Sequence, residues 1–362
     1  MAFRPFQRSL ASYAEEPQNN YLLLRFVAAL LVIYGHAYAI AKLPGRVEVD
    51  FIQRALRFTY AGGVGVDAFF VISGFLVTAS YLHRRDWPDF MKARCLRIFP
   101  GLLVCMLATM FLLGPAVSSL GPAAYLTDPQ LYANLLRNMT LVSVHFRLPG
   151  VFENLPVDAV NGSLWTLPVE FLLYVLLGIF GAAGILFSRR WYGPFILLCC
   201  VTAVVLALKV HFFIDKSIYL RLLLLFATGS VLRVYADRIP LSNWIFGALC
   251  LVTLLWYHHP GFEYLFTVWL IYAVFWAAYL PDLHGVNRMG DYSYGLYIYA
   301  FPIEQTLRQY IPAIQPLELF TCASFLTLGL AMLSWHFIEH PALELKKVKF
   351  REFLRRRAVV GS

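Results

Sequence analysis

The sequence predicts an all-α integral membrane protein with about ten transmembrane helices and with both chain termini on the cytoplasmic side. Three observations lead to this fold class. Of the 362 residues, 60% are hydrophobic and only 14% are charged, whereas soluble domains carry about a quarter charged residues. Apolar stretches long enough to span or nearly span a bilayer recur along the whole chain. Basic residues gather in the short segments between these stretches, as they do in cytoplasmic loops.

The candidate membrane helices follow from the length of each apolar stretch, because about 20 residues span the hydrocarbon core. The first stretch carries Arg25 and His36, which a cleaved signal peptide does not need, so it is predicted to remain as a helix. The ten stretches cover residues 21–41, 60–82, 98–118, 165–187, 192–210, 218–235, 242–258, 262–280, 291–310 and 317–338.

The orientation follows from the basic residues. Segment 83–97 is the most basic interior loop, so it is predicted to be cytoplasmic. Loop 119–164 then lies on the opposite side, where it is expected to fold over the outer mouth. The predicted domains are a cytoplasmic N-terminal segment, a transmembrane bundle and a basic cytoplasmic tail, at residues 1–20, 21–341 and 342–362.

The distribution of charge, the cysteines and the absence of certain motifs argue against a nucleic-acid-binding protein, a metalloprotein and the common soluble enzyme classes. The formal net charge of +9 lies in interior loops and in the tail, which indicates contact with anionic membrane lipid and no nucleic-acid partner. The six cysteines lie mostly in apolar runs without metal-ligand spacing, so reduced thiols and no metal are predicted. Motifs of nucleotide binding, of zinc peptidases and of serine hydrolases are absent.

Two ionisable residues share one face of the first predicted helix. Arg25 and His36 are eleven residues apart, which puts their side chains on one face and roughly 16 Å apart along the axis. Charged groups inside a bilayer are costly and are functional candidates by default. The alternatives are a snorkelling anchor for Arg25 and a helix-packing histidine for His36.

Three carboxylates are predicted at the depth of His36. Asp67, Glu170 and Glu304 each lie about six or seven residues from the outer end of a predicted helix, which is roughly 9–10 Å below the surface. A buried histidine beside a carboxylate is a general-base arrangement. The alternative is pairing within the bundle; we favour it for Asp67, and for Glu170 the two interpretations are even. Glu304 is the weaker catalytic candidate and is assigned to substrate binding.

A pair of arginines lies at the cytoplasmic entrance of the third predicted helix. Arg94 and Arg97 have the spacing i, i+3, so they share a helix face and can present two guanidinium groups to phosphates. The alternative is a positive-inside anchor. With Arg25 on the same side, the pair predicts a cytoplasmic site for an anionic donor.

These residues and their surroundings resemble the acyltransferase-3 family of integral membrane O-acyltransferases, which modify bacterial surface glycans and some small molecules. The resemblance runs in family order over almost the whole chain. The matching pieces are Arg25-x10-His36, 62–76 (GGVGVDAFFVISGFL), Arg94-x-x-Arg97-Ile-Phe-Pro, 162–170 (GSLWTLPVE), 291–299 (DYSYGLYIY) and 335–341 (WHFIEHP).

The resemblance implies a ten-helix bundle in the bacterial cytoplasmic (inner) membrane that takes acetyl, or sometimes a larger acyl group, from acyl-CoA. It implies that His36 is catalytic and that Arg25, Arg94 and Arg97 engage acetyl-CoA. Glu170 belongs to the family's tryptophan-to-glutamate motif, whose aromatic member, Trp165, is assigned to substrate binding. Many relatives carry a further esterase-like domain, and this chain is expected to be a stand-alone transferase.

The resulting hypothesis is an O-acetyltransferase. His36, oriented by Glu170 or Asp67, deprotonates a hydroxyl of a carbohydrate acceptor, such as exopolysaccharide or O-antigen, for attack on the thioester. An acyl-histidine intermediate is the main variant. A secondary transporter or exporter is the alternative function, because broken helices and intramembrane charges are also transporter features. A non-catalytic partner in glycan assembly is a third.

Overall fold

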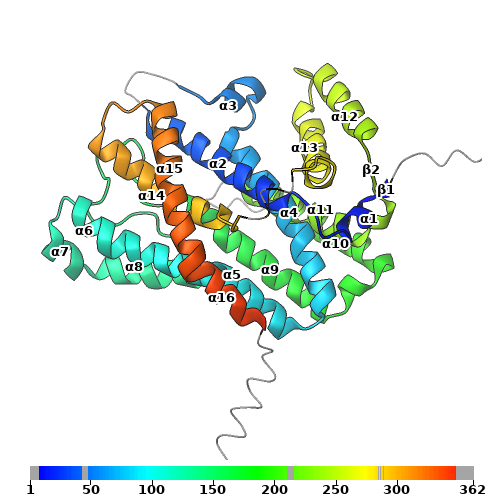
Figure 1. Ribbon diagram of the computed structural model, residues 1–362, viewed down its shortest axis with the longest axis horizontal. Coiled ribbons are helices and arrows are strands. Elements are labelled where there is room, and N and C mark those ends of the chain that lie inside the picture. Colours follow the sequence, from blue (N-terminus) through cyan, green and yellow to red (C-terminus); the bar gives the residue numbers. More distant parts are fainter. Residues whose placement is uncertain are drawn as a thin grey trace, which may run out of the picture. The chain divides into compact units, whose positions relative to one another are not determined.

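The computed structural model describes residues 8–42, 48–209, 216–283, 285, 287 and 289–347, and helices dominate this part of the chain (Figure 1). Its strand structure is one short antiparallel pair, β1 (Arg8–Ser9) with β2 (Pro240–Leu241). Most of the predicted basic tail lies outside the described residues, as does part of the predicted loop after the first helix.

Each of the ten predicted apolar stretches overlaps one long helix, but the bounds of the third, 98–118, were wrong: its helix begins at Trp87, so most of the segment 83–97, predicted as a loop, is helical. The helix bounds agree with the predicted ones to within a few residues at most other ends. The helices are α2 (Tyr21–Ile40), α4 (Ala61–Arg84), α5 (Trp87–Ala108), α9 (Thr166–Ala182), α10 (Arg189–Lys209), α11 (Lys216–Val234), α12 (Asn243–Leu255), α13 (Phe262–Tyr279), α14 (Ser293–Tyr310) and α15 (Pro316–Ser334).

Short helical elements extend or connect the long helices. Two π-helical turns continue α5 and α15, and a 3₁₀ turn leads into α9. The short elements are α1 (Leu10–Ala14), α3 (Phe51–Leu56), η1 (Thr109–Leu113), α6 (Gly114–Val117), α7 (Pro122–Thr127), α8 (Pro129–Thr140), η2 (Gly162–Trp165), η3 (Ile185–Phe187), η4 (Ala236–Arg238), η6 (Trp335–Glu339), α16 (His340–Glu344) and η7 (Leu345–Lys347).

Six helical spans within the described residues are long and apolar enough to cross a membrane. They are Tyr21–Ile40, Ala61–Arg84, Trp87–Val117, Gly162–Ala182, Phe262–Tyr279 and Pro316–Lys347. The chain is therefore a helical membrane protein, as predicted. The count of ten crossings and the cytoplasmic position of both termini stay predictions. Helix α12 has 13 residues, fewer than a span needs, and α14 is long enough but carries Glu304, Gln305 and Arg308.

The chain forms two compact units, each built from discontinuous segments. The first unit comprises Met1–Ala28, Val64–His83 and Ala183–Met289, and the second comprises Ala29–Gly63, Arg84–Ala182 and Gly290–Ser362. Helices α2 and α4 each contribute residues to both units. The predicted division at residues 20 and 341 stays a prediction.

In the first unit, glycine permits close helix contact. A Cβ at Gly74 of α4 would overlap the backbone carbonyl of Phe226 of α11, and a Cβ at Gly229 would overlap that of Val71. Small residues let membrane helices approach closely enough for backbone contact. The chain entering α2 is fixed by Asn20, whose amide donates to the carbonyl oxygens of Ala277 (2.9 Å) and Pro281 (2.7 Å).

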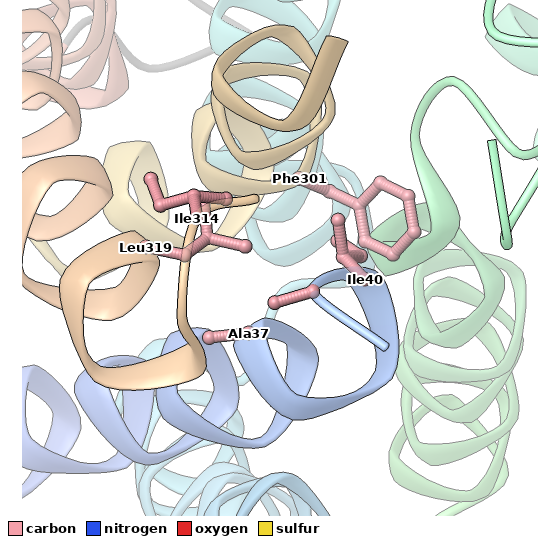
Figure 2. Close-up of a cluster of buried hydrophobic side chains, with 6 residues drawn as sticks. Ala37, Ile40, Phe301, Ile314 and Leu319 are labelled. Atoms are coloured by element: carbon pink, nitrogen blue, oxygen red, sulfur yellow. The ribbon is translucent and has the colours of Figure 1, made fainter. Parts of the chain in front are cut away.

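In the second unit, α14 packs along α15, and α5 packs against α9 and α16. Figure 2 shows part of the core of this unit, where side chains of α2, α14 and α15 gather. The cluster consists of Ala37, Ile40, Ala41, Phe301, Ile314 and Leu319, all of them buried. It fixes α2 against α14 next to His36, which directly precedes Ala37.

Candidate active site

His36 of α2 and Glu304 of α14 face each other in the second unit. The Nδ1 atom of His36 lies 3.6 Å from Oε2 of Glu304, slightly beyond direct hydrogen-bond distance. The Glu304 side chain is fully buried, and 14% of the His36 side chain is exposed. Nδ1 itself is buried, so the exposed surface of His36 belongs to side-chain atoms other than the one that faces the carboxylate. A carboxylate beside an imidazole whose side chain stays partly accessible is an arrangement that suits a general base.

Helix packing sets the orientation of the His36 ring. The ring meets Phe301 of α14 edge to face, with centroids 5.0 Å apart and planes at 74°. Phe301 fits because Gly162 has no Cβ, which would lie 2.6 Å from the phenyl ring. On the other side, a Cβ at Gly35 would lie 2.7 Å from the backbone nitrogen of Gly62. Two glycines therefore allow the close packing around the histidine.

Buried polar atoms without hydrogen-bond partners concentrate around this pair. Within the described residues they include Nδ1 of His36, both carboxylate oxygens of Glu304, Oε1 of Gln305, Nε and Nη1 of Arg308, Oδ1 of Asn161 and Oγ of Ser163. Leaving such an atom unpaired costs about 1–3 kcal/mol, and folded proteins retain few of them. This concentration makes the surroundings of His36 and Glu304 a candidate functional site, because stability alone would select against it.

Arg308 is a site residue that the sequence analysis missed. It is 6% exposed, and its one recorded hydrogen bond runs from Nη2 to the carbonyl oxygen of Lys42 at 3.4 Å. It follows Glu304 by four residues on α14, so the two side chains share a helix face. The sequence could have identified Arg308, because an arginine inside a predicted apolar stretch, here 291–310, is a functional candidate.

Glu170 and Trp165 lie at the start of α9. Glu170 accepts a hydrogen bond from the hydroxyl of Tyr174 one turn later. The guanidinium of Arg94 lies over the Tyr174 ring, 5.6 Å from its centroid, so Glu170 is associated with the arginine side of the second unit. Trp165 ends η2 and is partly buried, and the next residue, Thr166, is joined to Tyr297 of α14 by a 2.7 Å hydrogen bond.

Arg97 brings together three of the motifs noted in the sequence. Its Nη2 lies 2.8 Å from Asp291 Oδ2 and its Nη1 lies 3.7 Å from Glu339 Oε2. Ser293 donates to Asp291 (2.6 Å) and Ser334 donates to Glu339 (2.9 Å). Arg97 is thus held by two acidic residues, whereas within the described residues Arg94 has no carboxylate at ion-pair distance and its Nε is unpaired.

Asp67 lies in the first unit and is engaged by Arg221 of α11. Nε of Arg221 lies 3.0 Å from both carboxylate oxygens, and Nη2 lies 2.5 Å from Oδ2. Asp67 is 3% exposed. This bidentate pair supports the alternative that Asp67 pairs within the bundle. The sequence analysis did not single out Arg221, although it lies in a predicted span.

The Asp67–Arg221 pair gives a stability prediction. Asp67→Ala is expected to lower the free energy of unfolding by about 3 kcal/mol. This value is at the low end for breaking a buried ion pair, because the Arg221 side chain is partly exposed. The double variant Asp67→Ala/Arg221→Ala should recover part of this loss, since no unpaired charge remains. Thermal unfolding in detergent checks this. Single variants as stable as the unaltered protein would contradict it.

Arg25 occupies α2, as predicted, within the first unit, whereas Arg94 and Arg97 belong to the second. The predicted grouping of the three arginines therefore stays a prediction. Among the described residues, no group of three or more His, Cys, Asp or Glu side chains has the geometry of a metal site.

Comparison with known proteins decides the family. A family model described as an acyltransferase domain, acyltransferase family 3, matches residues 20–336. The chain belongs to this acyltransferase family. The predicted family, and acyltransferase as the class of enzyme, are thereby confirmed. No solved structure matches the chain.

Three named proteins are similar to this chain. An O-acetyl transferase of Shigella phage Sf6 is 29% identical over 333 residues, covering 89% of this chain and 95% of the relative. Nodulation protein 10 of Rhizobium leguminosarum bv. viciae is 28% identical over 360 residues, covering 91% and 94%. Exopolysaccharide production protein ExoZ of Rhizobium meliloti (strain 1021) is 35% identical over 134 residues, covering 37% of each chain.

Proposed function

We propose that this acyltransferase moves an acetyl group from cytoplasmic acetyl-CoA to a hydroxyl of a carbohydrate acceptor on the outer side of the bacterial inner membrane. The observation that carries the proposal is the buried His36–Glu304 pair, whose histidine side chain is partly exposed. The names of the relatives support acetyl transfer and a surface glycan as acceptor. The proposal includes ten crossings and cytoplasmic termini.

In the proposed reaction His36 acts as general base. It takes the proton of the acceptor hydroxyl while the oxygen attacks the thioester carbonyl carbon. The C–S bond then breaks, an ester forms, and the thiol of coenzyme A leaves with the proton from the imidazolium. Glu304 is the group placed to stabilise the imidazolium, because its Oε2 lies 3.6 Å from Nδ1 of His36. Arg308 is one turn further along α14, where it can donate to the developing oxyanion.

The donor site is proposed at the arginine side of the second unit. Arg94 is available for the phosphates of coenzyme A, since no carboxylate is paired with it in the described residues. Arg97 adds a second guanidinium whose orientation is set by Asp291 and Glu339. Guanidinium groups recognise phosphate by paired N–H donors. Arg25 is proposed as a third contact.

A donor titration tests this assignment. Arg94→Ala is expected to raise the KM for acetyl-CoA by about 10-fold or more, because one or two hydrogen bonds to a charged group are lost, while the KM for the acceptor stays constant. The measurement is the initial rate of ester formation in proteoliposomes. Arg190→Ala, which removes an equal charge from an arginine that lies over Trp191, is the control. An unchanged KM for acetyl-CoA would contradict the donor site.

A further inference from the structure

A cavity with both polar and apolar lining residues lies in the second unit between α8 and the segment that follows it. Its volume is about 610 Å³, within the range of about 300–1,000 Å³ of small-molecule sites. Its charged and amide-bearing lining includes Asn134, Arg137, His145, Arg147, Glu153 and Asp158. These residues fall in loop 119–164, which the sequence analysis predicts to lie at the outer mouth.

The walls of this cavity are held by hydrogen bonds between side chains and backbone. Asn138 of α8 accepts from the backbone nitrogen of His145 (2.7 Å) and donates to the carbonyl oxygen of the same residue (3.1 Å). Asn134 donates to the carbonyl oxygen of Arg147 at 3.0 Å. Glu153 accepts from the backbone nitrogen of Gly150 at 3.1 Å. These hydrogen bonds fix the positions of the segments that line the cavity.

The preceding short helix is anchored in the same way. The hydroxyl of Tyr125 in α7 donates to the carbonyl oxygen of Met110 at 2.9 Å, and burial raises the pKa of this tyrosine. Gly114 lies against the Tyr125 ring, where a Cβ would overlap the hydroxyl. Helices α6 and α7 thus lead into α8 in a fixed arrangement.

One wall of the cavity connects directly to the helix that carries Glu304. The amide of Gln305 donates to the carbonyl oxygens of Val157 (2.5 Å) and Ala159 (2.6 Å). Ala159 lines the cavity, and Gln305 directly follows Glu304 in α14. Asn161, two residues after Ala159, donates to the carbonyl oxygen of Ile298 in the same helix at 2.8 Å. The segment that ends the cavity lining is therefore hydrogen-bonded to the helix that carries Glu304.

The chemistry of the lining fits a polyhydroxylated ligand. Guanidinium groups supply donors, carboxylates supply acceptors, and a histidine supplies either. A sugar ring presents hydroxyls that both donate and accept, whereas a coenzyme with several phosphates would favour a lining of one sign. Arg147 lies 2.5 Å from Asp158, and no ion pair of Arg137 is recorded among the described residues, so Arg137 is available to a ligand.

We propose that this cavity binds the carbohydrate acceptor and presents its hydroxyl to His36. This inference rests on the proposed O-acetyltransferase function and assigns the acceptor-binding residues within it. Arg137 and Asp158 contact the sugar directly and set which glycan is acylated.

The test is acceptor kinetics with the purified protein in proteoliposomes. The probe is surface polysaccharide of the producing cell, freed of its esters by alkali, with acetyl-CoA as donor. Arg137→Ala and Asp158→Ala are each expected to raise the acceptor KM about 10-fold or more, as loss of a hydrogen bond to a charged group does. The KM for acetyl-CoA should stay constant. Arg137 is exposed, and the ion pair of Asp158 with Arg147 lies at the surface, where such pairs contribute little to stability, so the variants should fold.

Two outcomes separate the inference from the function on which it rests. If the unaltered protein forms esters and both variants keep its acceptor KM, as the control Arg190→Ala should, the cavity is not the acceptor site. If the unaltered protein forms no ester on the polysaccharide, the proposed function itself fails. A rise in acceptor KM for both variants, with thermal unfolding unchanged, supports the cavity.

Discussion

Replacing His36 by alanine is expected to lower the rate of O-acetyl transfer by about 10²–10⁴-fold, the contribution of general-base catalysis. The physical reason is the position of the ring, which is 3.6 Å from a fully buried carboxylate while part of the His36 side chain is exposed. No other described histidine is paired with a buried carboxylate. The rate of ester formation in membranes, normalised to the amount of inserted protein, measures the effect.

A second histidine variant controls for damage to the membrane protein. In the first unit, the His259 ring contacts Trp256 at a tilt, with centroids 5.1 Å apart and planes at 39°, and His259→Ala should keep the rate within a few-fold. If His36→Ala transfers acetyl groups at a near-normal rate, His36 is not the base and the mechanism is wrong. Detection of acetylated His36 after incubation with acetyl-CoA alone would instead favour the acyl-histidine variant.

Replacing Glu304 by glutamine is expected to lower the turnover by about 10²-fold, because the neutral amide no longer stabilises the imidazolium. The same change should leave the melting temperature unchanged or raised. Neither carboxyl oxygen of Glu304 has a hydrogen-bond partner among the described residues, so replacing this buried carboxyl group by an amide of similar size removes no hydrogen bond seen in the structure. Loss of turnover without loss of stability is the signature of a catalytic partner.

Glu170→Gln is the matched comparison for this variant. Glu170 bonds to Tyr174, so its replacement should affect donor binding more than turnover. If Glu170→Gln reduces turnover more than Glu304→Gln does, Glu304 is not the carboxylate that serves His36. A fall in melting temperature that matches the loss of activity of Glu304→Gln would also contradict its catalytic role.

The sequence predicted the helices well, because membrane spans are set mainly by the length of an apolar stretch. Apolar length does not predict α12 correctly. The predicted stretch 242–258 contains a helix of only 13 residues, which is shorter than a membrane span needs. Helix α14 shows another limit. Its buried residues include Glu304, Gln305 and Arg308, and their burial follows from contacts within the second unit, which hydropathy does not report.

The sequence analysis included both His36 and Glu304 among its candidates but did not predict that they form a pair. Counting 1.5 Å per residue places Glu304, Glu170 and Asp67 at the depth of His36. It does not say which neighbour each helix face meets. That choice depends on packing between helices far apart in the sequence, such as the contact of Phe301 with the His36 ring. The pairing of Arg221 with Asp67 is likewise set by packing, whereas Tyr174 lies one turn after Glu170 in the same helix.

The motif around Arg97 illustrates the same point. The sequence identified Arg97 and the segments that contain Asp291 and Glu339 as parts of a family pattern. Spacing along the chain cannot show that the three residues form one charged cluster. Their separation in sequence exceeds 190 residues for the Arg97–Asp291 pair, so only the folded chain brings them together.

The most direct test of the central claim is mass spectrometry of surface glycans from cells that carry the unaltered gene, the His36→Ala variant or the Glu304→Gln variant. The account predicts one acetyl mass per modified sugar with the unaltered protein, and a large loss of this mass with either variant at equal protein levels. Glycans acetylated to the same extent with the unaltered protein and with His36→Ala would contradict it.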